Sequence, residues 1–207
     1  MATGGGVTTL KLDSVVLAAG AGTRFGGEKL TAPWRDGVLL DGALGAAFAA
    51  PARSIVVVWG ADPAVCAAAD AFARRRGQTD RLRLLQAADY ADGLSASLKA
   101  GVRALAADSD GVFVFLGDMP HIPHSIAPAL ADALAAGAAA AAPIMAGRRG
   151  HPALIGKALM PRLLTLSGDK GAGGLLTDLG AALALVATDD SGVLIDVDRP
   201  PDLGEAG

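Results

Sequence analysis

The stretch VVLAAGAGTRFGGEKL, residues 15–30, decides the fold and the chemistry of this chain. It begins at 15–17 with Val-Val-Leu, a short apolar run that is typical of a buried strand. The small residues 18–22 follow directly, and without bulky side chains they let backbone N–H groups approach a ligand. Arg24 and Lys29 add two cations to a segment that is otherwise almost uncharged. A strand, a glycine loop and two cations together predict a binding site for a polyphosphate.

Two well-known phosphate loops do not fit this stretch. The P-loop requires Gly-Lys-Ser/Thr, whereas here Glu28 follows Gly27. The dinucleotide fingerprint requires a third glycine where this chain has Phe25, although Asp41 lies near the distance expected for a ribose-binding acid. That acid keeps a nicotinamide-dependent oxidoreductase as an alternative. Against it, Gly27 and Pro33 interrupt the region in which that fold needs one continuous helix.

Residues 17–30 read Leu-Ala-Ala-Gly-x-Gly-x-Arg-Phe-Gly-Gly-x-Lys-Leu, which resembles the signature loop of the nucleotidyltransferases that build molybdenum cofactor dinucleotides. Its Leu-Ala-Ala-Gly form is similar to the cytidylyltransferase branch, since the guanylyltransferase branch more often carries Leu-Ala-Gly-Gly. The resemblance implies that Arg24 and Lys29 are catalytic cations acting on a triphosphate. It also implies nucleotide binding by Leu17, Ala18, Ala19, Gly20, Gly22 and Thr23.

The composition indicates one globular domain. We expect a single nucleotidyltransferase domain over residues 1–207, with a flexible start at 1–12. Hydrophobic residues make up 52% of the chain, but alanine accounts for much of this. We find no run of about 18 strongly apolar residues, and therefore expect no membrane association. The start lacks the cationic and apolar pattern of a signal peptide.

One cysteine, Cys66, cannot form an internal disulfide, which is consistent with a reducing compartment, and we expect a cytoplasmic protein. The net charge of −3 gives no indication of a nucleic-acid partner. Apolar runs at 54–60, 81–85 and 111–116 alternate with helical segments, which predicts an α/β fold with a parallel-type sheet and helices on both faces. The resemblance, which extends from 15 to 203, implies a Rossmann-like nucleotidyltransferase fold with a mixed, mostly parallel sheet.

An acidic residue follows the apolar run at 111–116. Open α/β sheets place ligands and metals at the carboxyl ends of their strands, which is where the motif Gly-Asp-Met-Pro at 117–120 would lie. Mg²⁺ bound together with phosphates typically takes one or two carboxylates from the protein. The motif also matches the metal-binding motif of the family as it stands. We therefore expect Asp118 to bind Mg²⁺ and to take part in catalysis.

The last apolar run, at 193–197, predicts another strand. Asp196 and Asp198 would lie on one face of it, so either could complete the metal site with Asp118. We favour Asp196, because it would lie deeper in the strand. The family pattern in this region resembles Asp-Ile-Asp-Thr-Pro-Glu-Asp-Leu, and both acids are retained here.

Three further loops have counterparts in the family. The segment Gly-Leu-Ser-Ala-Ser-Leu at 93–98 resembles one that lies near the base and ribose, which implies roles for Gly93 and Ser95. Upstream of it, Ala-Ala stands at 87–88 where an Asn-Pro pair is common in the family, a departure that concerns the choice of base if that asparagine contacts the base. The loops at 150–152 and 168–173 resemble acceptor-binding loops, and the residues assigned to the acceptor are His151, Asp169 and Lys170. Gly173 stands where the family has an arginine.

Displacement at an α-phosphorus builds negative charge on phosphate oxygens, and proteins lower such a barrier through positioning and cations. The resemblance implies a Mg²⁺-dependent enzyme that transfers CMP from CTP to a phosphorylated molybdopterin-type (pterin) cofactor and releases pyrophosphate. A molybdoenzyme is a further expected partner. The alternatives are a guanylyltransferase of the same family, an NAD(P)-dependent oxidoreductase on the same fold, and a non-catalytic nucleotide-binding protein.

Overall fold

The computed structural model describes residues 9–20, 22, 25–168 and 171–205. Its strands are β1 (Leu12–Ala18), β2 (Pro33–Trp34), β3 (Gly37–Val38), β4 (Ile55–Trp59), β5 (Leu82–Gln86), β6 (Gly111–Leu116), β7 (Ala140–Met145), β8 (Arg148–Arg149), β9 (Ala153–Gly156) and β10 (Leu183–Ala187). Its α-helices are α1 (Leu40–Ala49), α2 (Pro63–Arg75), α3 (Leu94–Arg103), α4 (Ile126–Ala135), α5 (Met160–Leu163), α6 (Gly173–Asp178) and α7 (Asp202–Glu205).

The main sheet of the described chain has eight strands in the order β10-β7-β9-β6-β1-β4-β5, with β8 paired to β7. The strands β6, β1, β4 and β5 run parallel to one another, as do β10 and β7. Strand β9 is antiparallel to both β6 and β7, and it joins the two parallel blocks. The prediction of a mixed, mostly parallel Rossmann-like sheet is therefore confirmed.

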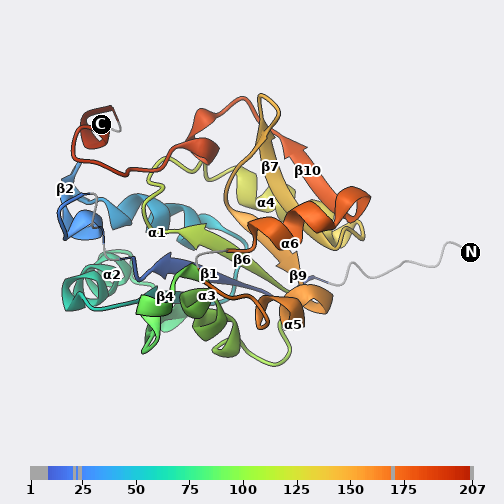
Figure 1. Cartoon of the computed structure of the whole chain (residues 1–207), viewed down its shortest axis with the longest axis horizontal. Helices are drawn as coiled ribbons and strands as arrows, with labels where there is room; N and C mark the ends of the chain where they lie inside the picture. Colours follow the sequence, from blue (N-terminus) through green and yellow to red (C-terminus); the bar gives the residue numbers. More distant parts are fainter. Residues whose placement is uncertain (1–8, 21, 23–24, 169–170, 206–207) are drawn as a thin grey trace, which may run out of the picture.

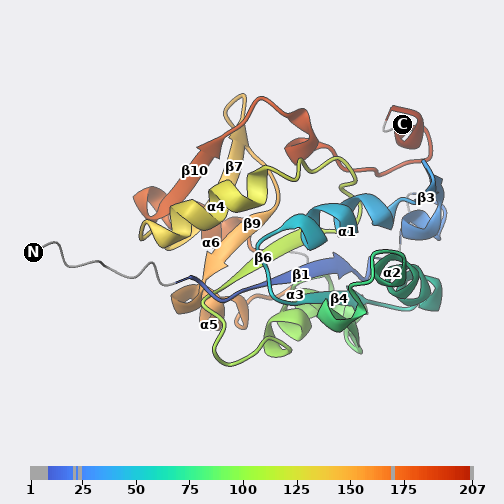
Figure 2. The same cartoon turned by 180° about the vertical axis from the view of Figure 1, so that it is seen from behind.

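Helices cover both faces of this sheet. Helices α3, α5 and α6 lie on the face seen in Figure 1, and α1, α2 and α4 lie on the opposite face, seen in Figure 2. Strand β1 contributes side chains to the cores on both faces of the sheet, because alternate side chains of a strand point to opposite faces. Val16 packs in the core under α1 and α2, whereas Val15 and Leu17 pack in the core under α3. All seven residues of β1 are buried, which explains the apolar run that begins at Val15, while the buried Asp13 is paired with Arg53 and Ser54.

The register of the sheet gathers three loops at one edge. Leu17 of β1 pairs with Leu116 of β6, and Ala18 pairs with Trp59 of β4, so these parallel strands end side by side. Residues 19–22, 60–62 and 117–120 follow these strand ends. The loops that carry the sequence motifs therefore meet where open α/β sheets bind ligands.

The starts of two elements are defined in detail. Asp62 caps α2, since its side chain accepts the N–H of Ala64 at 2.9 Å, and Pro63 occupies the first helical position. Of the expected flexible start at 1–12, residues 1–8 lie outside the described chain, while Leu12 already belongs to β1 and is buried. Among the described residues, no helix is both long and apolar enough to cross a bilayer.

The fit between α1 and the loop after β6 is tight enough to test. A Cβ added at Gly42 would overlap the carbonyl of Pro120, two residues beyond Asp118. We expect Gly42→Ala to destabilise the fold by about 1–3 kcal/mol in urea unfolding, as overpacking does. Gly45→Ala in the same helix is the matched control, because its Cβ would meet only His124 at 3.4 Å. A Gly42→Ala protein as stable as the control would contradict this prediction.

Candidate active site

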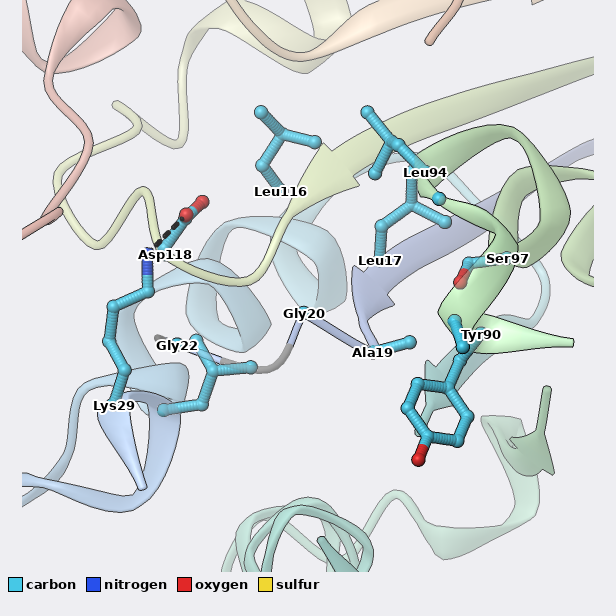
Figure 3. A pocket seen from close by; sticks show the side chains of 13 residues that line it. Leu17, Ala19, Gly20, Gly22, Lys29, Tyr90, Leu94, Ser97, Leu116 and Asp118 are labelled. Atoms are coloured by element: carbon cyan, nitrogen blue, oxygen red, sulfur yellow. Dashed lines mark hydrogen bonds and ion pairs between the residues drawn. The ribbon is translucent and has the colours of Figure 1, made fainter. Parts of the chain in front are cut away.

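The loops at the carboxyl edge of the sheet surround a cavity of about 490 Å³ (Figure 3). Small and apolar residues form most of its wall, which lets backbone atoms approach a ligand closely. Its described lining residues are Leu17, Ala19, Gly20, Gly22, Lys29, Leu30, Tyr90, Ala91, Gly93, Leu94, Ser97, Leu116 and Asp118.

Most residues predicted to bind nucleotide meet in this cavity. Leu17, Ala19, Gly20, Gly22 and Gly93 all line it. Ala18 lines a smaller cavity of about 130 Å³, which shares Ala19, Gly20 and Lys29 with the larger one. Two predicted residues of the glycine loop, Thr23 and Arg24, lie outside the described residues.

The glycine loop turns back on itself at Gly22, whose φ of 58° lies in the left-handed region. The carbonyl of Gly22 accepts the N–H groups of Phe25, Gly26 and Gly27 at 2.9, 3.1 and 3.1 Å. The loop itself therefore uses these three donors, so any phosphate would meet the backbone nearer β1. A Cβ at Gly22 would also lie 3.1 Å from the Cβ of Lys29, which favours glycine at this position.

Lys29 lies next to two carboxylates at one side of the cavity. Its Nζ donates to Oδ2 of Asp118 at 2.7 Å and lies 3.7 Å from Oδ1 of Asp198. The Lys29 side chain is only 12% exposed and that of Asp118 27%, so water screens this ion pair less than a surface pair. The structure thus joins two predicted catalytic residues and one predicted metal ligand around a single positive charge.

Backbone hydrogen bonds fix this arrangement. The N–H of Gly117 donates to the carbonyl of Leu17 at 2.9 Å, which ties the turn after β6 to the end of β1. The N–H of Val197 donates to the carbonyl of Asp118, also at 2.9 Å. The carboxyl-terminal segment is therefore attached directly to the turn that carries Asp118.

This segment is not the strand that the apolar run at 193–197 predicts. Residues Ser191–Leu194 form a 3₁₀ turn, and in the described chain 195–198 pair with no strand. The segment bonds to loops instead, since Val193 accepts the N–H of His151 at 2.8 Å. The preference for Asp196 depended on that strand and is not supported, because the contact with Lys29 places Asp198 beside Asp118.

Asp202 orients the turn that carries Asp198. Its Oδ2 accepts the N–H of Asp198 at 2.9 Å and that of Arg199 at 2.7 Å. These contacts lower the pKa of Asp202, and the N–H of Arg199 contributes most. The carboxylate of Asp202 therefore accepts backbone hydrogen bonds, whereas the carboxylate of Asp198 faces Lys29.

Of the two serines in the segment 93–98, the structure places Ser97 in the large cavity and Ser95 in another. Ser95 lines a separate cavity of about 380 Å³ with Lys99 and Arg103, and its N–H donates to the carbonyl of Gly168 at 3.1 Å. The phase of helix α3 explains this, because residues 93, 94 and 97 share a face that 95 does not. The sequence could have indicated this difference, because helical periodicity places Ser95 and Ser97 on different faces of a predicted helix.

Another cavity, of about 250 Å³, adjoins the large cavity and shares Leu17, Leu94 and Leu116 with it; we call it the second cavity. It contains the predicted acceptor residue His151 together with Arg149. Burial lowers the pKa of His151, against an opposing effect of the Asp118 carboxylate, so the imidazole is neutral near pH 7. The other two predicted acceptor residues, Asp169 and Lys170, lie outside the described residues.

Arg149 lies next to Gly173, the residue that stands where the family has an arginine. Its Nη2 donates to the carbonyl of Gly173 at 2.8 Å, and a Cβ at Gly173 would lie 3.7 Å from the same nitrogen. Both guanidinium nitrogens also lie 3.3 Å from the hydroxyl of Thr177. The second cavity therefore keeps a cation near Gly173, supplied by a different element, β8.

The residues at the lysine end suit a divalent metal ion. The ammonium of Lys29 shows that Asp118 and Asp198 accept a positive charge between them. Within the described residues no group of three or more His, Cys, Asp or Glu side chains could hold a metal. The pair Asp118 and Asp198 nevertheless fits a divalent metal ion bound together with phosphates and water, because such an ion takes only one or two carboxylates from the protein.

The loop after β1 does not have the geometry of a dinucleotide-binding site. There the glycine loop leads directly into a helix, whose N-terminus receives the pyrophosphate. Here a three-residue 3₁₀ turn, Lys29–Thr31, and the hairpin β2–β3 intervene before α1 begins at Leu40. Strand, loop, lysine and paired carboxylates instead define the class of Rossmann-like nucleotidyltransferases.

Comparison with known proteins gives the family. The family described as the MobA-like NTP transferase domain matches residues 14–184, and the chain belongs to it and is a nucleotidyltransferase. The chain is 26% identical over 196 residues to the molybdenum cofactor cytidylyltransferase of Escherichia coli K12, across 92% of this chain and 93% of the relative.

Solved structures support the same fold. The crystal structure of Rv0371c from Mycobacterium tuberculosis H37Rv is similar with a TM-score of 0.79 and 25% identity, over 96% of this chain and 98% of that one. A structure of Rv0371c in complex with manganese has a TM-score of 0.72 at 23% identity, with the same two coverages.

Proposed function

We propose that this nucleotidyltransferase moves CMP from CTP to a phosphorylated pterin-type acceptor, with Mg²⁺ as the metal and pyrophosphate as the second product. The observation that carries the proposal is the position of Lys29, next to Asp118 and Asp198 and beside the glycine loop. The similarity to a molybdenum cofactor cytidylyltransferase over nearly the whole chain supports the identity of donor and acceptor. The molybdoenzyme that receives the product would be a further partner.

The residues suggest how the reaction proceeds. A metal ion held by Asp118 and Asp198 would neutralise charge on the phosphate oxygens. Lys29 then turns from Asp118 to the triphosphate and stabilises the charge that develops on the departing pyrophosphate. Arg24, which follows the glycine loop in sequence, is assigned to the same triphosphate. The acceptor enters with a phosphate that is already anionic, so it needs no general base.

The second cavity is assigned to the acceptor. Its apolar wall includes Leu98 and Leu176, which suit a flat heterocycle, and Arg149 offers a cation for a phosphate. His151, neutral near pH 7, would present a hydrogen-bonding imidazole between this cavity and Asp118. Because the two cavities share three leucines, the acceptor phosphate and the nucleotide can meet between them.

The donor preference is the direct test. Ala18 and Ala19 stand where the resembling family separates cytosine from guanine, so we expect the highest kcat/KM with CTP. The measurement is pyrophosphate release with CTP, GTP, ATP and UTP in turn, each with Mg²⁺ and a molybdopterin-type acceptor. A preference for GTP would identify a guanylyltransferase of the same fold. Nucleotide binding without pyrophosphate release from any donor would identify a non-catalytic binding protein.

A further inference from the structure

The large cavity has a charged side and an aromatic side. Lys29 and Asp118 lie on one side in Figure 3, while Tyr90 lies on the other, beyond Ala19. Among the described lining residues, Tyr90 is the one aromatic side chain. A nucleotide has the same polarity, with anionic phosphates at one end and a flat heterocycle at the other.

Tyr90 is positioned firmly enough to form a wall. It begins the 3₁₀ turn Tyr90–Asp92, which is attached to the sheet because the N–H of Ala87 donates to the carbonyl of Trp59 at 2.9 Å. The N–H of Tyr90 in turn donates to the carbonyl of Ala87 at 3.3 Å. The turn that carries the ring is therefore linked to the end of β4.

Gly60 brings the ring close to the glycine loop. A Cβ added at Gly60 would lie 3.1 and 3.2 Å from Cγ and Cδ2 of Tyr90, and 2.7 Å from the carbonyl oxygen of Ala19. The ring thus lies directly against the backbone of Gly60, where a larger residue would push it away from the loop. Tyr90 also lines the smaller cavity that contains Ala18, so its ring borders both spaces beside the loop.

We propose that Tyr90 is the surface on which the base of the bound nucleotide stacks, an inference that rests on the proposed nucleotide site. Every base has a π-face, so an aromatic wall binds it with little dependence on its hydrogen-bonding pattern. Stacking is a contact of the ring, and replacement of Tyr90 by phenylalanine tests the hydroxyl separately. Tyr90 therefore determines affinity for nucleotides, while the choice between cytosine and guanine depends on other residues.

Titration calorimetry with two probes tests this role. The first probe is CTP with Mg²⁺, and the second is inorganic tripolyphosphate with Mg²⁺, which carries the same kind of charge without a base. Tyr90→Leu should weaken CTP binding about tenfold, the size of one lost stacking contact, and leave tripolyphosphate binding unchanged. Tyr90→Phe, which keeps the ring, should bind both probes like the unmodified protein.

The controls separate stacking from other effects. Lys29→Met should weaken both probes, because it acts at the phosphate end. Tyr90→Leu should lower CTP and GTP affinity by similar factors. An equal loss of CTP and tripolyphosphate in Tyr90→Leu would show that the ring only supports the loop, and unchanged CTP affinity would show that the base does not stack there. If the unmodified, folded protein bound tripolyphosphate but no nucleoside triphosphate, the proposed nucleotide site itself would be wrong.

Discussion

Lys29→Met is expected to lower kcat/KM for nucleotidyl transfer by about 30- to 1000-fold, equivalent to about 2–4 kcal/mol of transition-state stabilisation. The reason is that its ammonium lies in a largely enclosed position beside the glycine loop, where a charge acts more strongly than in water. Methionine keeps the apolar stem of the side chain and removes only the charge. The measurement is steady-state pyrophosphate release with CTP.

The same variant should change metal binding in the opposite direction. Lys29 lies 2.7 Å from Asp118, so its ammonium competes with a metal ion for that carboxylate. Titration with Mn²⁺ alone should therefore show tighter binding to Lys29→Met than to the unmodified protein. Lys99→Met, on the surface of α3 in a different cavity, is the control and should change neither quantity. Near-normal turnover of a folded Lys29→Met protein would exclude the role of this lysine at the triphosphate.

The sequence predicts the centre of the fold well because that centre is buried on both sides. Strands β4 and β6, and β1 from Val15 onward, appear as continuous apolar runs, since each lies between neighbours in the sheet and is covered by helices on both faces. The acid at Asp118 and the glycine loop then follow from the rule that parallel strands place ligands at their carboxyl ends. Local pattern and tertiary position agree in this part of the chain.

The carboxyl-terminal segment shows where sequence reasoning fails. Val193 and Val197 are both fully buried, which the apolar run at 193–197 indicates correctly. The two residues do not belong to a strand, however, because their backbone groups form hydrogen bonds with the backbone of His151 and of Asp118. Alternation along a strand is therefore no guide to the direction of Asp196 and Asp198. Only the three-dimensional contact with Lys29 distinguishes the two acids.

The roles of Tyr90 and Arg149 could not be predicted from the sequence either, because each depends on an element that is distant in the chain. Tyr90 has no charge and belongs to no motif that we identified, and its role depends on the approach of Gly60, 30 positions earlier in the chain. Arg149 replaces the charge missing at Gly173 only because the hairpin of β7 and β8 brings it there. Such contacts are set by the packing of distant segments, and a single sequence does not contain them in readable form.

The proposed metal site provides the second large expected effect. Asp118→Asn removes one anionic ligand and should weaken Mg²⁺ or Mn²⁺ binding in the presence of CTP by at least about 10- to 100-fold, the loss that even outer-shell partners of a metal cause. The fold should remain intact, since the backbone carbonyl of Asp118, rather than its side chain, receives the N–H of Val197. Metal-dependence curves of pyrophosphate release, together with direct Mn²⁺ titration, measure this loss.

The two late acids form a matched pair for the same measurement. Asp198→Asn should reproduce most of the Asp118→Asn loss, because the Asp198 carboxylate lies 3.7 Å from the ammonium that Asp118 also binds. Asp196→Asn should have the smaller effect, since Asp196 is exposed. Its carboxylate acts electrostatically on His151, where it opposes the lowering of the pKa by burial. A severe loss at Asp196 with a mild one at Asp198 would mean that this segment rearranges when nucleotide binds. If all three variants kept normal metal dependence, these carboxylates would be structural, and the metal would have to be held by the triphosphate alone.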